Sequence, residues 1–170
     1  MVTTRATSTD LREAVGAVPD PEVPVLSIAD LGILRGVAVD EAAGTVEVTI
    51  TPTYSGCPAM SAITDHVAHV CRRAGWEPRV TTRLSPAWTT DWMSPEGREK
   101  LRRFGIAPPG GSSPVGLVGP VTVALGRRVV TCPRCGSDDT TELARFGSTA
   151  CKSLRRCEAC REPFDEFKTL

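Results

Sequence analysis

The chain has 170 residues, 41 % of them hydrophobic, which is enough for one ordinary core and a small appendage. Its 20 basic and 20 acidic residues give a net charge of zero, so no global field attracts nucleic acid or an anionic membrane. The N-terminal segment lacks the apolar stretch of a signal peptide, and no apolar run approaches the roughly 20 residues that span a bilayer. We therefore expect a cytoplasmic protein, with no membrane and no nucleic acid among its partners.

The first residues predict a short helix followed by a turn. Asp10 and Glu13 fit a capping box at the start of a helix. The segment VPDPEVP (18–24) contains three prolines, so this helix must end by Val18. SIADLG (27–32) then predicts a single helical turn.

Three strands and a longer helix follow. The segments ILRGVAV (33–39) and VEVTITPT (46–53) predict a hairpin, and PRVTTRL (78–84) predicts a third strand. Apolar residues recur at helical spacing over 60–74, which predicts a helix that stops at Gly75.

A further helix, opened by Ser94 and Pro95, completes a predicted domain over residues 8–105. Residues 106–126 are rich in proline, glycine and serine and predict a linker, and residues 127–170 form a cysteine-rich module. The predicted fold class is α/β: helices packed on a short mixed sheet, followed by a small β module.

The C-terminal module carries two CxxC motifs, Cys132/Cys135 and Cys157/Cys160, separated by 21 residues. Each motif directs two sulfurs to one point, and two motifs complete a tetrahedron around Zn²⁺. The module has few large apolar side chains, so we expect a structural zinc ribbon that the metal holds together. An iron–sulfur cluster on the same four thiolates is the alternative. The role of Cys151, outside the motif spacing, stays open.

The other cysteine of interest, Cys57, stands between Gly56 and Pro58, just before the predicted helix. The positive end of that helix favours a thiolate there, so Cys57 is either a soft ligand or nucleophile, or a buried residue near the cap. His66 and His69 lie about 13 to 18 Å farther along the helix at about 1.5 Å per residue, too far to serve as its base. They fit a solvated helix face better than a shared metal site, and Cys71 fits the core.

Three separate blocks of this sequence resemble one family. DPEVPVLSIADLGILRGV (20–37), TPTYSGCPAM (51–60) and SPAWTTDWMSPEGREKLRRFGIAPP (85–109) are similar to the iron–sulfur cluster assembly domain shared by SufT and its eukaryotic counterparts. With the ending FGSTACKSLRRCEACREPFDEFKTL (146–170), the chain resembles the PaaD (PaaJ) family, the small accessory proteins of bacterial phenylacetyl-CoA epoxidase systems.

The resemblance implies a site that transfers iron or an iron–sulfur cluster. Carried onto this sequence, its residues are Asp20, Glu22, Thr51 and Cys57. A thiolate beside carboxylates can bind iron transiently, but one thiolate cannot hold a cluster that usually takes four. A second copy of the chain, as a homodimer, or ligands from a client would complete the site. Asp20 and Glu22 have an alternative role as caps of their own turn.

The function implied is a non-catalytic maturation factor in phenylacetate degradation. It would assist iron–sulfur or di-iron centres of the epoxidase, with the oxygenase and reductase components and the iron–sulfur assembly machinery as partners. The alternatives are a structural subunit of the epoxidase, a nucleic-acid-binding zinc ribbon, and a thiol enzyme built on Cys57. The near-zero charge of the ribbon argues against nucleic acid. A cluster of Trp88, Trp92, Met93 and Phe104 either closes a core or forms a docking surface.

Overall fold

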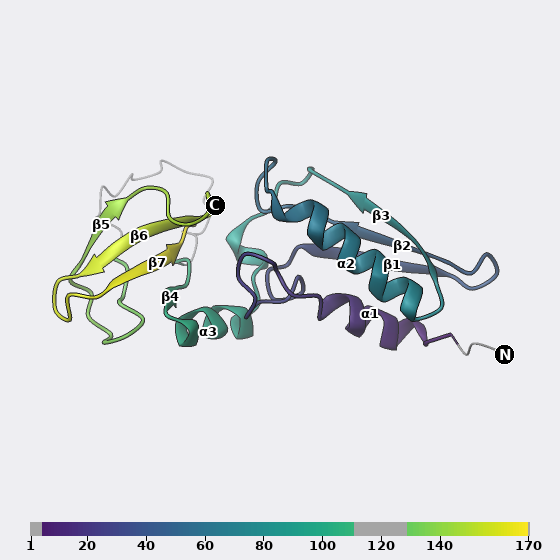
Figure 1. The fold of residues 1–170 in the computed structure, drawn as a ribbon, viewed down its shortest axis with the longest axis horizontal. Helices are drawn as coiled ribbons and strands as arrows, with labels where there is room; N and C mark the ends of the chain where they lie inside the picture. The colour runs from purple at the N-terminus through teal and green to yellow at the C-terminus, as the bar shows by residue number, and fades with distance from the viewer. Residues whose placement is uncertain (1–4, 111–128, 170) are drawn as a thin grey trace, which may run out of the picture. The chain divides into compact units, whose positions relative to one another are not determined.

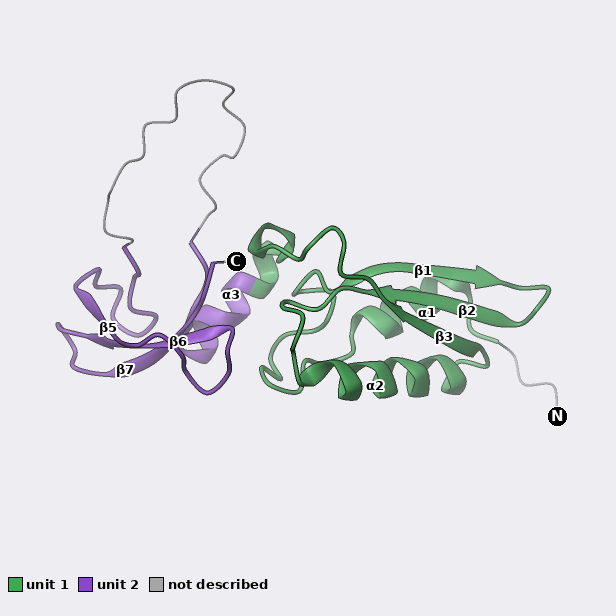
Figure 2. Ribbon diagram, turned by 90° about the horizontal axis from the view of Figure 1, so that it is seen from above, with its two compact units in different colours: residues 1–97 green, residues 98–170 purple. Residues whose placement is uncertain are grey.

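The computed structural model describes residues 5–110 and 129–169, which form two compact units, Met1–Gly97 and Arg98–Leu170 (Figures 1 and 2). Each unit has its own sheet, and the boundary between the units falls within helix α3 (Pro95–Phe104). The predicted class, α/β with a short mixed sheet and a following β module, is confirmed. None of the helices in the described ranges has the length and apolarity that a membrane crossing requires.

The first unit contains a three-stranded sheet of order β1-β2-β3. Strands β1 (Leu34–Asp40) and β2 (Thr45–Ile50) form the predicted antiparallel hairpin, and β3 (Glu77–Thr82) joins β2 in parallel. Helices α1 (Ser8–Gly16) and α2 (Ala59–Arg73) pack beside this sheet (Figure 2). Because β1 begins where β2 ends, the segments that enter β1 and leave β2 lie at the same end of the sheet.

The core of the first unit follows from the periodicity of its elements. On β2, Val46, Val48 and Ile50 are fully buried and alternate with more exposed residues, as one covered face of a sheet requires. On α2, Ile63 and Val67 are fully buried one turn apart. Apolar stripes of both kinds of element therefore meet between the sheet and the helices.

The ends of the helices have local causes. Helix α1 begins at Ser8, because the Thr7 hydroxyl accepts a hydrogen bond from the amide of Asp10. The predicted start at Asp10 was therefore wrong by a few residues, and Asp10 is the partner of the cap. Helix α2 ends as predicted: Gly75 has φ +87°, and the next amide, of Trp76, donates to the carbonyl of Cys71.

The second unit contains a four-stranded sheet of order β4-β7-β6-β5. The antiparallel strands are β5 (Thr140–Ala144), β6 (Lys152–Cys157) and β7 (Pro163–Phe167), while the two-residue β4 (Ile106–Ala107) joins β7 in parallel. The hairpin of β5 and β6 occupies the interval between the two CxxC motifs.

The predicted domain limits of 8–105, 106–126 and 127–170 can be compared with these units only in part. Ile106 and Ala107, assigned to the linker, belong to the second sheet. The rest of the predicted linker beyond residue 110 lies outside the described residues. The limits therefore stay a prediction.

Candidate functional site

The four cysteines of the two CxxC motifs come together in the second unit. Their sulfurs all lie within 4.8 Å of one another; the Sγ atoms of Cys132 and Cys160 are 3.9 Å apart, and those of Cys135 and Cys157 are 3.5 Å apart. Thiolates bound at about 2.3 Å to one tetrahedral ion stand about 3.8 Å apart. In a four-iron cluster each thiolate binds a different iron, which spreads the sulfurs farther. The donor set therefore fits a single metal ion.

The two CxxC turns are built alike. In the first, the Cys132 carbonyl accepts from Gly136 and the Cys132 amide donates to the Ser137 carbonyl. In the second, Cys157 makes the same two bonds with Arg161 and with Glu162, one and two residues after the motif. Gly136 and Arg161 both have positive φ, 75° and 66°. The repeated backbone geometry aims both pairs of sulfurs at one point.

The thiols of this group shift each other's acidity. Donation from the Cys160 amide, aided by the thiols around it, lowers the pKa of Cys157 to about 7 against the effect of desolvation. The Ser137 amide favours the thiolate of Cys135, but the adjoining Cys157 sulfur and desolvation raise its pKa to about 12 on balance. Four thiols this close do not all ionise together without a cation among them, and a bound dication meets that need.

One cluster of buried apolar residues in the second unit contains metal-site cysteines. The cluster consists of Ala107, Val130, Cys132, Cys157 and Phe164, with Cys160 packed against it. Half of these residues are members of the four-cysteine group. Stability of the unit therefore depends on what the cysteines bind.

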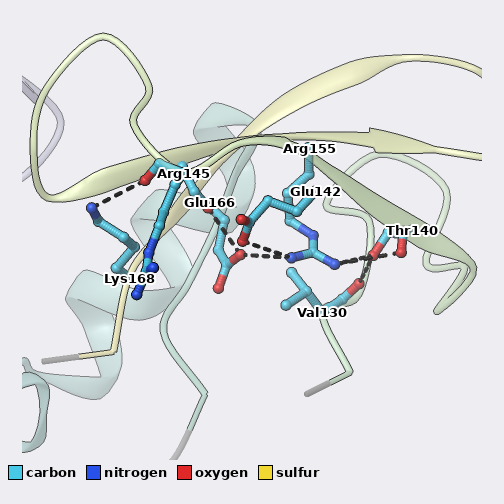
Figure 3. Close-up of polar contacts among 8 residues, drawn as sticks. Val130, Thr140, Glu142, Arg145, Arg155, Glu166 and Lys168 are labelled. Atoms are coloured by element: carbon cyan, nitrogen blue, oxygen red, sulfur yellow. Dashed lines mark hydrogen bonds and ion pairs between the residues drawn. The ribbon is translucent and has the colours of Figure 1, made fainter. Parts of the chain in front are cut away.

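A buried charge network supports the same unit (Figure 3). Arg155 on β6 forms an ion pair with Glu166 on β7 at 3.2 Å, and their side chains are 10 % and 1 % exposed. The Arg155 guanidinium also donates to the Thr140 carbonyl and hydroxyl on β5, and Ser153 donates to Glu166. One guanidinium thus connects all three antiparallel strands, close to Cys157 in the sequence.

The predicted transfer residues lie in two segments at one end of the first unit's sheet (Figure 1). Cys57 is half-buried in loop 51–58, and its amide donates to the Tyr54 carbonyl at 3.2 Å. Pro58 stands in the helical conformation at the N-cap of α2, and the first turn of that helix carries no acidic residue. The positive end of α2 therefore lies next to this loop.

Asp20 is a buried residue that holds its own turn. Its Oδ1 accepts from the amides of Glu22 and Val23, at 2.9 and 2.7 Å, and its amide donates to Leu26. The capping alternative thus describes what the Asp20 carboxylate contacts. Glu22 is half-buried, and Thr51 is buried, with its amide bonded to the Ile33 carbonyl. The transfer role of all four residues stays a prediction.

The degree of burial separates the remaining cysteines from the two histidines. Cys71 is fully buried, and desolvation raises its pKa, as a core thiol requires. His66 and His69 are exposed on α2. Cys151 is buried outside the four-cysteine group, with its sulfur 3.0 Å from the Thr149 hydroxyl.

The tryptophan segment mostly closes a core rather than standing open. Trp88 and Met93 are each only 4 % exposed, and the Trp88 indole donates to the Leu31 carbonyl. Trp92 is half-buried beneath the guanidinium of Arg35. Phe104, in the second unit, is 56 % exposed.

Comparison with known proteins shows which family this chain belongs to. The family model described as the PaaD zinc beta ribbon domain matches residues 119–168. A protein of Escherichia coli (strain K12), provisionally named as a subunit of 1,2-phenylacetyl-CoA epoxidase, is 49 % identical over 158 residues, which are 90 % of this chain and 87 % of that protein. The chain belongs to the PaaD family. Its C-terminal module is the zinc ribbon characteristic of that family, with four cysteines in a metal-binding group.

The first unit has its own relatives. The model of the iron–sulfur cluster assembly protein family matches residues 8–82. An Fe-S protein maturation auxiliary factor of Porphyromonas gingivalis is 35 % identical over 97 residues, covering 56 % of this chain and 90 % of that protein. The crystal structure of a domain of unknown function, DUF59, from Bacillus anthracis has a TM-score of 0.50 and 29 % identity, and the match covers 55 % of this chain and 89 % of that one. This PaaD-family chain therefore joins an assembly-type domain to a zinc ribbon.

The groups that sequence reasoning missed are polar and depend on tertiary contacts. Asp30 is buried and accepts from the Ser27 amide and hydroxyl, and Ser94 donates to the same carboxylate from 64 residues away. A Ser-x-x-Asp pattern at 27–30 is a local capping signal for the first of these contacts. Nothing local indicates the second.

Proposed function

We propose that this protein is a non-catalytic maturation factor of the phenylacetyl-CoA epoxidase system, assisting assembly of an iron–sulfur or di-iron centre in the oxygenase or reductase component. The observation that carries the proposal is the joining, in one chain, of an iron–sulfur assembly-type domain and a PaaD zinc ribbon. Relatives of the two parts are named for iron–sulfur maturation and for the epoxidase.

The two groups of cysteines have different tasks in this proposal. Cys132, Cys135, Cys157 and Cys160 hold one Zn²⁺ in a closed tetrahedral site, where the metal supplies folding energy rather than chemistry. Cys57 offers a single soft donor in a half-buried loop, which can take up iron or a cluster as cargo but cannot saturate its coordination. The client supplies the remaining ligands and so receives the cargo.

Asp20 acts in this scheme through the shape of its turn. Its carboxylate is already engaged by two backbone amides, so a role as an iron ligand would require those bonds to break. Thr51 begins the loop that carries Cys57, and Glu22 follows in the turn of Asp20; these two are the remaining candidates for contact with the cargo.

The test is co-expression of the epoxidase components with the wild-type chain, with Cys57→Ser, or with Cys71→Ala. Iron and acid-labile sulfide are then measured in the purified oxygenase and reductase. We expect Cys57→Ser to fold and bind one zinc but to leave a client under-filled with iron. Cys71→Ala removes a thiol that is wholly buried in the same unit and should leave client iron unchanged. Full client iron with Cys57→Ser would refute the transfer role.

A structural subunit of the epoxidase is the second candidate, because the Escherichia coli relative is named as a subunit. A subunit co-purifies with the complex in fixed stoichiometry, whereas a maturation factor is absent from the finished complex. Size-exclusion chromatography of the assembled components with the wild-type chain separates the two.

A further inference from the structure

Three arginines to which none of the roles above assigns a task line a groove in the first unit. The groove has a volume of about 550 Å³, and its charged lining consists of Arg12, Arg35 and Arg83 with one carboxylate, Glu47. Three guanidiniums against one carboxylate make this a positive site on a chain whose net charge is zero.

The strand register explains why these residues meet. The Thr51 amide donates to the Ile33 carbonyl at 2.9 Å, and the Arg83 amide donates to the Ile50 carbonyl at 2.9 Å. The residues just before β1, just after β2 and just after β3 therefore lie in one row. Arg35 and Arg83 flank that row, and Arg12 reaches it from α1 by donating to the Val37 carbonyl at 2.9 Å.

The floor of the groove is the sheet face turned away from the core. Gly36 pairs with Thr49 and Ala38 with Glu47, while the alternating residues Val48 and Ile50 are buried. A Cβ added at Gly36 would meet no atom within 4 Å. The floor is therefore open, and a chain can approach its backbone closely.

The arginines are positioned without being neutralised. The Arg35 guanidinium lies 3.6 Å from the centroid of the Trp92 ring, a cation–π contact that holds it in place while leaving its charge. Over residues 5–110 and 129–169, none of Arg12, Arg35 and Arg83 forms an ion pair with a carboxylate. Leu84, next to Arg83, is 59 % exposed, so an apolar contact is available beside the positive charge.

We propose that this groove docks an acidic, extended segment of the client protein. Guanidinium groups bind carboxylates through paired, charge-assisted hydrogen bonds, which gives charge complementarity to Asp- and Glu-rich peptide. The groove is open along the sheet rather than enclosed, which suits a polypeptide better than a small ligand, whose sites bury most of its surface. The inference rests on the proposed function for the identity of the client.

The placement gives the groove a task in that function. Thr51 lines the groove and also begins loop 51–58, which carries Cys57. A client segment held at the groove is therefore bound at the end of the sheet where the thiol loop lies, before any iron moves.

The experiment measures binding of the purified oxygenase and reductase components to the immobilised full-length chain by biolayer interferometry. Arg83→Glu reverses one groove charge without removing a contact of that side chain in the described structure, and Gly36→Glu places a carboxylate on the open floor. Arg79→Glu is the matched control, because Arg79 is exposed on the same sheet face, pairs with Glu47 in the register and does not line the groove.

We expect one component to bind the wild-type chain, with a dissociation constant that rises about tenfold or more in Arg83→Glu and Gly36→Glu. Arg79→Glu should change it less than about twofold, and added KCl should weaken wild-type binding more than Arg83→Glu binding. Equal binding by all variants, equal weakening by Arg79→Glu, or binding of neither component would overturn the proposal.

This outcome is separable from the proposed function. If the client contains its full iron with Cys57→Ser, the transfer role is refuted, even if the groove binds a component. Unchanged binding by Arg83→Glu and Gly36→Glu refutes the groove even where Cys57→Ser leaves the client short of iron.

Discussion

Removing the carboxylate of Glu166 should destabilise the zinc ribbon far more than its position away from the metal suggests. Glu166 lies 3.2 Å from Arg155, and its side chain is 1 % exposed. At an effective dielectric constant of about 20, unit charges at that separation attract by about 5 kcal/mol. Glu166→Ala leaves the Arg155 guanidinium buried without this partner and leaves the Ser153 hydroxyl without its acceptor. We expect a loss of about 3–5 kcal/mol in the free energy of unfolding of the second unit.

Hydrogen exchange of the zinc-loaded chain measures this loss directly. The opening free energy of amides in β6 and β7 should be much smaller in Glu166→Ala than in the wild-type chain. The opening free energy of amides in β1, β2 and β3 should not change, and these amides act as an internal reference. The matched variant replaces both partners, Arg155→Met with Glu166→Leu, and should lose about 2 kcal/mol or less, because it removes both buried charges together. A loss below about 1 kcal/mol in Glu166→Ala, or a double variant as unstable as the single one, would refute the reasoning.

Two further predictions concern the metal and the backbone. Chelation of zinc, or Cys135→Ser, should unfold residues 129–169 and leave the first unit folded. The reason is that Cys132 and Cys157 belong to a buried cluster of the second unit and structural zinc contributes about 10–16 kcal/mol. Two-dimensional NMR spectra report on the folding of both units in one measurement. Cys151→Ser is the control and should still bind one zinc. A ribbon that stays folded without metal would contradict the prediction. Gly32→Ala should cost about 2–4 kcal/mol, because Gly32 has φ +69° and a Cβ there would overlap Trp92. Gly36→Ala, with open space around it, should change stability by less than about 0.5 kcal/mol in thermal unfolding, and equal stability of the two variants would count against the strain.

The parts of the structure that sequence could predict are those with local causes. The CxxC spacing determines that Cys132 and Cys135 turn toward one point, because the hydrogen bonds that close the turn join residues four or five apart. The end of α2 at Gly75 follows from the left-handed conformation that glycine adopts readily. The pairing of β1 with β2 follows from alternation and a short turn. Each of these predictions is confirmed.

The parts that sequence could not predict depend on residues far apart in the chain. Strand β4 has two residues, Ile106 and Ala107, and exists only because β7 runs beside it. The sequence leaves open whether the tryptophan segment closes a core or forms a docking surface. The Trp88 ring is buried because its indole donates to the Leu31 carbonyl, 57 residues away, a contact that no local pattern indicates. The arginine groove combines two strand ends, which the register brings together, with Arg12 of α1, which donates to the Val37 carbonyl.

The two kinds of cysteine site in this chain differ in how far the protein completes them. In the ribbon, four sulfurs within 4.8 Å satisfy a tetrahedral ion entirely, so that the metal has no position left for a partner. Loop 51–58 offers one sulfur, and the carboxylate of Asp20 is already used by its own turn. A cargo ion at Cys57 would therefore keep open coordination positions, and it would be released as soon as a client offered more ligands. Such a site is useful only if the client is held nearby, and the arginine groove on the same unit can supply that attachment.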